Sequence, residues 1–163
     1  MRKGLSEKEL EVISWLELKN KYFFTRDEIK DKFKTVNEMN VYLYRLRKKG
    51  RIIKLNKTKH FLIPIKSIKG KWSEHPFILI DEIMNGKNYC IIGKAAAHYW
   101  KLIDDIPYEY EIYNTKKHGL LIIFNAKLNF KKRREKNIPL GVKRKVYNHT
   151  FIIASKKESK KWT

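Results

Sequence analysis

Apolar residues repeat at helical spacing near the start of the chain. Leu10, Ile13 and Leu16 recur every three or four positions, as on one face of an amphipathic helix. Ser6 and Glu9 precede this run with the Ser-x-x-Glu spacing of a capping box. The pattern predicts a first helix that ends near Asn20.

Two further Thr-x-x-Glu pairs begin at Thr25 and Thr35 and predict two more helices. The second is short, with Ile29 and Phe33 buried. The third extends to about Lys49 and is followed by Gly50, a residue suited to the left-handed position after a helix. Its predicted buried side consists of Val36, Met39, Leu43 and Leu46.

After Gly50 the spacing becomes that of extended chain. Residues 51–55 and 60–64 flank a polar tip at 56–59, which predicts a two-stranded hairpin with a basic tip. Three helices followed by a hairpin, with a short connection between the second and third helices, are typical of a winged helix-turn-helix. We therefore expect that domain over residues 1–68.

The remaining residues predict a small mixed α/β domain at 72–155, which makes the whole chain α+β. A lysine-rich linker at 66–71 precedes a helix that is expected to begin after Pro76, with Ser73 or His75 as its cap, and Asn85-Gly86 ends that helix. Residues 89–92 are predicted to form a buried strand or turn that leads into an alanine-rich helix. Three extended segments follow, at 109–114, 119–125 and 145–154, and residues 156–163 are expected to form a frayed basic tail.

Charge is distributed unevenly over the 163 residues, whose formal net charge is +21. Residues 1–71 and 116–163 carry net charges of +12 and +13, whereas residues 72–115 carry −4. Two separate basic surfaces favour a polyanionic partner, and double-stranded DNA is the first hypothesis. The alternative is a solvated lysine-rich surface. The 42% hydrophobic content argues against a disordered basic chain.

The third predicted helix is the expected recognition helix, because its outer face carries amide, aromatic and cationic groups. Asparagine bonds adenine edges, and residues near the start of such a helix lie closest to the bases. Base contacts are predicted for Asn37, Asn40, Val41 and Tyr44. Phosphate contacts are predicted for Thr25, Arg26, Arg45, Arg47, Lys48, Arg51, Lys57 and Lys59, with Thr25 and Arg26 acting at a helix N-terminus.

A second basic patch is predicted near the C-terminus, either to extend the DNA footprint or to bind an acidic protein; a solvated loop is the alternative. Its residues are Lys131, Lys132, Arg133, Arg134, Lys143, Arg144 and Lys145.

The residues predict no enzyme, cofactor or metal site. The acidic cluster Asp104, Asp105, Glu109 and Glu111 raises a nuclease hypothesis, but no second acidic group follows to complete a metal pair. The five histidines are scattered without metal-ligand spacing, and the single cysteine, Cys90, is expected to be buried. Lys87 and Ala95 stand where a P-loop needs glycine and Ser or Thr. No signal segment or membrane span is evident, so a cytoplasmic protein without membrane contact is expected.

One segment carries a family resemblance. Tyr89-Cys90-Ile91-Ile92-Gly93-Lys94-Ala95-Ala96-Ala97, followed by Tyr99-Trp100, Leu102 and Ile106-Pro107, resembles the AbiEi-type antitoxin family, as does the order of winged helix and basic strand-rich tail. The resemblance implies a regulator of viral defence that represses its own operon by binding inverted repeats. It also implies a C-terminal domain that neutralises a nucleotidyltransferase toxin.

Three functional hypotheses follow. The first is a sequence-specific transcriptional regulator, binding as a homodimer or as two neighbouring monomers. The second is a sequence-tolerant architectural protein that coats DNA. The third is an antitoxin that acts by binding its toxin, with the DNA contact vestigial.

Overall fold

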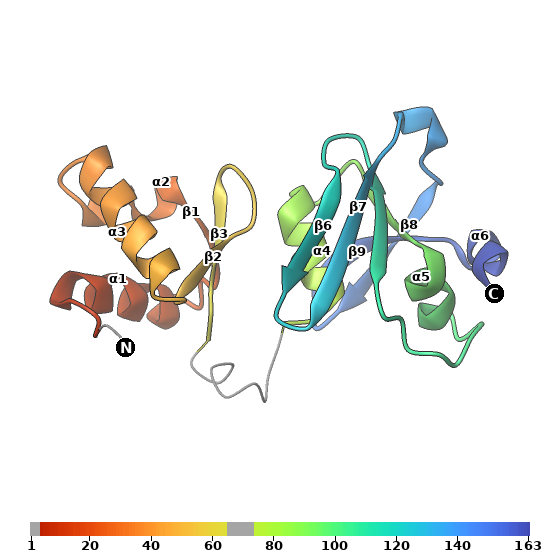
Figure 1. Ribbon diagram of the computed structural model, residues 1–163, viewed down its shortest axis with the longest axis horizontal. Coiled ribbons are helices and arrows are strands. Elements are labelled where there is room, and N and C mark those ends of the chain that lie inside the picture. The colour runs from red at the N-terminus through yellow and green to blue at the C-terminus, as the bar shows by residue number, and fades with distance from the viewer. Residues whose placement is uncertain (1–3, 65–73) are drawn as a thin grey trace. The chain divides into compact units, whose positions relative to one another are not determined.

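The computed structural model describes residues 4–64 and 74–163, and shows a mixed α+β protein (Figure 1). The chain forms two compact units, residues 1–72 and 73–163, each of which has its own sheet. The predicted linker at 66–71 lies outside the described residues.

Unit 1 consists of short helices and a three-stranded sheet of order β1-β3-β2. Its elements are α1 (Glu7–Leu18), β1 (Phe23–Thr25), α2 (Arg26–Ile29), a 3-10 turn (Lys30–Lys32), α3 (Val36–Lys48), β2 (Ile52–Lys54) and β3 (Lys59–Leu62). The predicted helix starts and the hairpin are confirmed. The strand β1 was not predicted; it pairs antiparallel with β3, and Phe23 stacks on Phe61 with ring centroids 4.7 Å apart.

The core of unit 1 lies between α1, α3 and the sheet. Ile13 and Leu16 of α1 pack in one buried cluster with Leu43 and Leu46 of α3. Leu16 is fully buried. The prediction that Val36 belongs to this core is wrong: 66% of that residue is exposed, because it occupies the first turn of α3 and faces solvent.

A buried ion pair joins α1 to the end of α3. The Lys49 ammonium lies 2.6 Å from Glu9 Oε2, and Glu9 is 1% exposed. The same oxygen accepts a 2.7 Å hydrogen bond from the Ser6 N–H of the capping box. Burial raises the pKa of Glu9, but Lys49 and Ser6 outweigh that effect, so the pKa is lowered below its ordinary value.

Glu9→Gln is expected to destabilise unit 1 by about 2 kcal/mol, because it leaves a largely buried ammonium without its counter-charge. The free energy of unfolding, measured by urea titration at pH 7, checks this. Glu11→Gln is the matched control, since Glu11 is over half exposed and pairs with Lys8 at 3.6 Å; it should change stability by less than about 0.5 kcal/mol. Equal effects of the two variants would contradict the account.

Unit 2 is built on a six-stranded mixed sheet of order β6-β7-β5-β4-β9-β8. Its strands are β4 (Tyr89–Ile92), β5 (Tyr110–Asn114), β6 (Gly119–Ile123), β7 (Ala126–Lys132), β8 (Gly141–Val146) and β9 (His149–Ala154). The central strands β4 and β5 are antiparallel, and each pairs parallel with its outer neighbour, β9 and β7.

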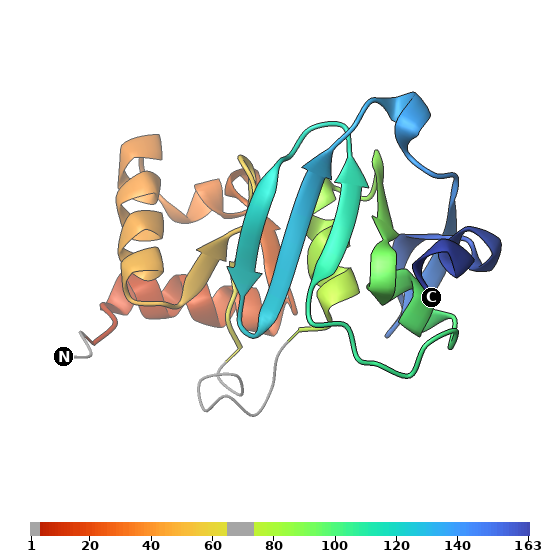
Figure 2. The same cartoon turned by 45° about the vertical axis from the view of Figure 1, so that its right-hand side comes forward.

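The sheet of unit 2 is covered unequally on its two faces. Helix α4 (Pro76–Met84) lies behind β5 and β7 in Figure 2, and Phe77 of this helix packs on Phe151 of β9 at 4.7 Å between ring centroids. Helix α5 (Gly93–Tyr99) follows β4 directly. The outer face of β6 is open, and Leu120 and Ile122 are 56% and 58% exposed there.

The strands of the C-terminal third depart from the sequence prediction in two places. Residues 126–132, expected to lie outside the extended segments, form β7. The single extended segment predicted at 145–154 contains the last two residues of β8 and the whole of β9. These two strands form a hairpin whose turn is Tyr147 and Asn148. Both turn residues have positive φ, 48° and 63°, as in the two-residue type I′ turn.

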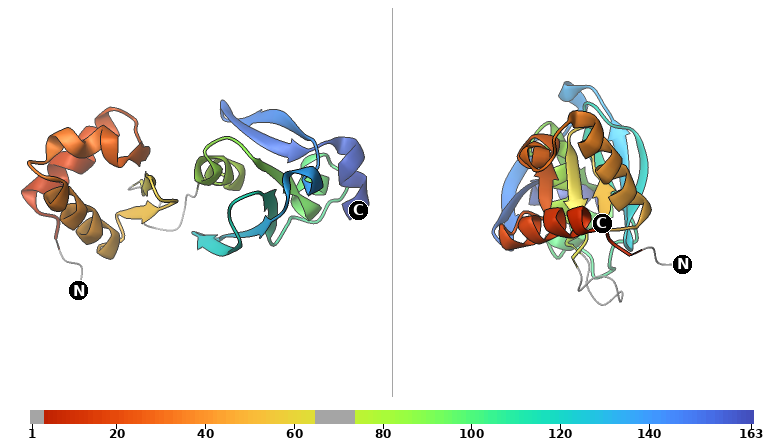
Figure 3. Two further views of the ribbon diagram at one scale, coloured as in Figure 1. Left: turned by 90° about the horizontal axis from the view of Figure 1, so that it is seen from above. Right: turned by 90° about the vertical axis from the view of Figure 1, so that its left-hand side faces the viewer.

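The predicted frayed tail is ordered. Residues 156–163 contain α6 (Lys156–Ser159) and a 3-10 turn (Lys160–Trp162), directly after β9 (Figure 3). The Ser155 hydroxyl caps α6 by accepting from the Glu158 N–H, and Ser159 is fully buried. The sequence Ser-x-x-Glu at 155–158 is the same capping signal that marks the N-terminal helices.

Among residues 4–64 and 74–163, no helix has the length and apolar character needed to cross a membrane.

Candidate nucleic-acid interface

Helix α3 presents two chemically different sides. Met39, Leu43 and Leu46 are buried on the inner side. On the outer side Val41 and Tyr44 are exposed apolar and aromatic side chains, at 46% and 56%. The other exposed side chains of this side are Asn37, Arg45, Arg47 and Lys48. The face therefore offers amide, aromatic and cationic groups together.

The predicted base-contacting residues differ in accessibility. Asn37, Val41 and Tyr44 are exposed, whereas Asn40 is half-buried. The Oδ1 atom of Asn40 is enclosed and has no hydrogen-bond partner among the described residues. Tyr44 is held by Lys48 one turn later, whose ammonium lies 5.3 Å from the ring centroid.

Three cations from three different elements converge around a buried histidine. His60 of β3 is 1% exposed and stacks on Phe24 at 5.6 Å between ring centroids. Burial, together with the charges of Arg26, Lys54 and Arg47, lowers the pKa of His60 to about 4. These cations come from α2, β2 and α3, and all three are exposed.

Arg26 and Arg47 were predicted from the sequence as phosphate contacts, but Lys54 was not. The signal was available, because Lys54 is the polar end of the first hairpin strand, one pair before the tip. Lys54 can act with Arg47 only because β2 lies beside α3, and no local sequence pattern predicts that contact.

Thr25, predicted to contact phosphate at a helix N-terminus, belongs to a capping box with Glu28. The Thr25 N–H donates to Glu28 Oε2 at 2.8 Å, and the Thr25 hydroxyl lies 3.4 Å from the same oxygen. The carboxylate of Glu28 therefore places a negative charge at the start of α2, which disfavours a phosphate at that position. The Lys21 ammonium, 2.6 Å away, lowers the pKa of Glu28 and keeps it charged.

The hairpin tip is built by one asparagine. Asn56 Oδ1 accepts from the N–H groups of Thr58 and Lys59, at 3.0 and 2.9 Å, which closes the turn and leaves Lys57 exposed. Lys59, predicted at the tip with Lys57, is instead the first residue of β3 and is half-buried. Arg51 is also half-buried, and its Nε is enclosed without a hydrogen-bond partner among the described residues.

The second basic patch is divided between two separate parts of the sheet. Lys131 and Lys132 end β7, whereas Lys143, Arg144 and Lys145 lie on β8. Strands β5, β4 and β9 lie between them, a separation of about 19 Å at the usual strand spacing. The patch predicted from the sequence is therefore not one surface.

Three members of that patch already have protein partners. The Arg133 guanidinium donates to the Lys132 carbonyl oxygen at 2.9 Å and lies 5.0 Å from the Tyr113 ring centroid. Lys131 forms a 2.9 Å ion pair with Glu111 across β7 and β5. The Arg144 guanidinium donates to the Tyr99 hydroxyl at 3.0 Å and lies 5.2 Å from the Trp100 ring centroid. Arg133, Arg134, Lys143 and Lys145 are exposed.

The two glutamates of the acidic cluster considered for a nuclease have partners on β7. Glu111 pairs with Lys131, and Glu109 accepts from the Asn129 side chain. Cys90, predicted to be buried, is 1% exposed, and burial raises the pKa of its thiol to about 12. One histidine departs from the expectation of scattered residues: His149 lies beside two carboxylates of α4, Asp81 and Glu82.

No family model matches this chain, and no curated protein matches it either.

Proposed function

We propose that unit 1 is a winged helix-turn-helix that binds duplex DNA, and that the protein is a sequence-specific transcriptional regulator. The observation that carries the proposal is the exposed outer face of α3, which lies beside cations that α2 and β2 contribute around His60. Amide and aromatic groups suit base edges, and the flanking cations suit phosphates.

In this proposal α3 enters the major groove. Asn37, Val41 and Tyr44 contact bases, and Asn40 does so if a base edge reaches its enclosed amide oxygen. Arg26, Arg45, Arg47, Lys48, Lys54 and Lys57 neutralise phosphates on either side of the groove, with Lys57 acting from the hairpin tip. The protein then needs no cofactor for binding.

The family resemblance of residues 89–107 supports a finer proposal. The protein would act in the cytoplasm as an autorepressing antitoxin of a defence operon, with unit 2 available to bind a nucleotidyltransferase toxin. A sequence-tolerant coating protein is the competing outcome, since a charge of +21 alone suffices for non-specific binding.

The proposal is tested by fluorescence anisotropy with an unrelated 20-base-pair duplex at increasing salt. Each neutralised phosphate contributes about −0.9 to the slope of log K against log salt, so six contacts give a slope of about −5. A slope near zero, or no binding at low salt, would contradict DNA binding.

Homodimer formation is proposed through strand β6. Within the described part of the chain, β6 and β8 are the two outermost strands of the unit 2 sheet. Strand β8 carries Lys143, Arg144 and Lys145, charges of the kind that discourage edge pairing, whereas β6 is Gly-Leu-Leu-Ile-Ile without a charge or proline. An uncharged edge pairs readily with a second copy of itself about a two-fold axis.

Ile122→Lys is expected to convert the dimer to a monomer, because it places two like charges across the paired strands. Ile122 is over half exposed, so unit 2 should remain folded, as circular dichroism would show. Analytical ultracentrifugation at about 100 μM measures the change, with Lys143→Ala on the opposite edge as the control. A wild-type protein that is monomeric at this concentration would overturn the dimer proposal and leave two independent monomers on DNA.

A further inference from the structure

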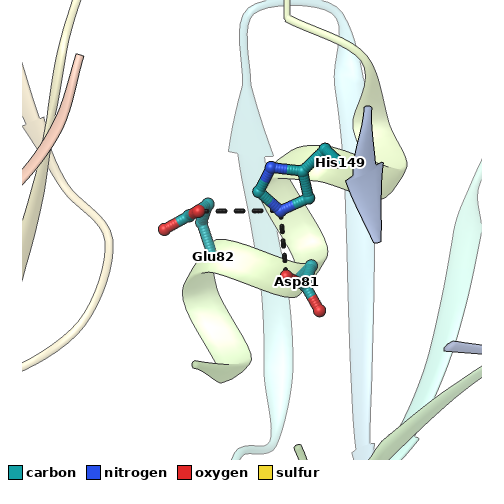
Figure 4. A group of neighbouring side chains, drawn as sticks. All are labelled: Asp81, Glu82 and His149. Carbon is teal, nitrogen blue, oxygen red and sulfur yellow. Dashed lines mark hydrogen bonds and ion pairs between the residues drawn. The ribbon is translucent and has the colours of Figure 1, made fainter. Parts of the chain in front are cut away.

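Three metal-binding side chains of unit 2 meet at the end of helix α4. His149 Nε2 lies 2.9 Å from Asp81 Oδ2 and 3.6 Å from Glu82 Oε1. The three donor atoms all lie within 4.8 Å of one another. Figure 4 shows the imidazole directed toward both carboxylates, which come from successive residues of α4. We propose that Asp81, Glu82 and His149 form a binding site for a divalent transition metal of the zinc type.

The separations fit the first coordination sphere of zinc. Zinc binds nitrogen and carboxylate oxygen at roughly 2.0–2.2 Å in tetrahedral geometry, which places neighbouring ligand atoms about 3.3 Å apart. The two distances from His149 Nε2, 2.9 and 3.6 Å, lie on either side of that value. Metal binding would replace the hydrogen bond between Nε2 and Asp81 with bonds from both groups to the ion.

A buried tyrosine orients one of the carboxylates. The Tyr89 hydroxyl donates to Asp81 Oδ1 at 2.7 Å and accepts from the Ile152 N–H at 2.9 Å. Tyr89 is 3% exposed, so these hydrogen bonds hold its hydroxyl in a fixed position. It fixes one oxygen of Asp81 so that the other faces His149, the role that outer-shell partners have at metal sites.

The donor set favours zinc over magnesium or calcium. Imidazole suits zinc, cobalt, nickel and copper, whereas calcium takes six or more oxygen ligands and magnesium keeps an octahedral shell of oxygens. Three protein ligands leave a fourth position for water. The side chains are 15–24% exposed, so the site is enclosed yet reachable by an ion.

A metal ion at this site would link two elements of unit 2. His149 is the first residue of β9, directly after the type I′ turn that joins it to β8. The two carboxylates lie in the last turn of α4. A bound ion would therefore fasten the β8–β9 hairpin to α4, and metal binding would stabilise unit 2 without involving the proposed DNA face.

Titration of the full-length protein with Co²⁺ tests the proposal, because tetrahedral cobalt absorbs visible light and zinc then displaces it. We expect one equivalent of cobalt to bind with this spectrum. His149→Ala should weaken cobalt binding at least 100-fold, and Glu82→Gln by about 10-fold. His118→Ala, at an exposed histidine remote in sequence from the cluster, should bind as the wild type does.

Circular dichroism of each variant shows whether unit 2 is folded. If His149→Ala does not fold, the comparison is made with Glu82→Gln instead. No tetrahedral cobalt spectrum with the wild type, or an equal spectrum in folded His149→Ala or Glu82→Gln protein, would overturn the proposal. Loss of the spectrum in His118→Ala would overturn it as well, by placing the metal elsewhere.

Discussion

Simultaneous replacement of Arg26, Arg47 and Lys54 by alanine is expected to weaken binding to duplex DNA by about 100-fold or more at 0.1 M salt. These exposed cations come from α2, α3 and β2, and their charges all lower the pKa of the buried His60, so we expect all three to contact the same duplex. Three lost phosphate contacts should reduce the slope of log K against log salt by about 2.7. Anisotropy titrations at four or more salt concentrations measure both quantities.

The matched control removes the same charge from unit 2. Lys156, Lys157 and Lys160 are exposed lysines of the C-terminal helical segment, which is outside the proposed interface. Their triple alanine variant should keep the wild-type salt slope. Equal losses in the two triple variants would show that net charge, and not the surface around His60, determines binding.

The geometry of this surface can be checked without DNA. Because Arg26, Arg47 and Lys54 lower the pKa of His60, their removal should raise it, while burial keeps it below the ordinary 6.5. An NMR titration of the His60 ring in the triple variant measures this shift. A pKa equal to that of the wild type would mean that the three cations do not surround the histidine.

Acidification is expected to destabilise unit 1 by about 3 kcal/mol between pH 6.5 and pH 4. The unfolded chain takes up a proton on His60 below pH 6.5, but the folded unit does so only near pH 4. The stability that His60 contributes is therefore complete above pH 6.5 and is lost progressively as the pH falls to 4. Glu9 and Glu28 have pKa values lowered below 4.5, so most of their contribution is lost at lower pH.

His60→Phe should remove this pH dependence. Phenylalanine keeps the stack on Phe24, and the enclosed Nδ1 of His60 has no hydrogen-bond partner among the described residues that would be lost. Urea titrations followed by NMR of unit 1 amides separate the two units. His118→Ala, at an exposed histidine, should behave as the wild type. An unchanged loss of stability in His60→Phe would contradict the assignment.

Elements with local signals could be predicted from the sequence. Thr35 caps α3 by accepting from the Glu38 N–H at 3.1 Å, and Gly50 follows it with φ of 70°, so both ends of the proposed recognition helix are encoded nearby. The exposed face of α3 follows from helical spacing once the ends are known. The prediction that Val36 is buried was wrong because helical spacing alone does not show that the first turn of α3 extends beyond the core.

Elements that depend on distant partners were missed or misjudged. Strand β1 has three residues and exists through pairing with β3. Buried and exposed residues do alternate in strand β7, where Leu128 and Phe130 are fully buried. The basic residues at 131–134 obscured this pattern in the sequence. The convergence of Arg26, Arg47 and Lys54 likewise needs three elements to meet, and the approach of His149 to Asp81 needs β9 to lie beside α4.

Sequence-specific DNA binding can be tested by comparing two duplexes. Affinity is measured by fluorescence anisotropy at near-physiological salt, for a duplex from the region upstream of the protein's own coding sequence and for a scrambled duplex of equal composition. We expect a preference of roughly 10³ or more for the upstream duplex. Equal affinity for both would contradict a regulator and favour a coating protein, and no binding to either would contradict the DNA interface itself.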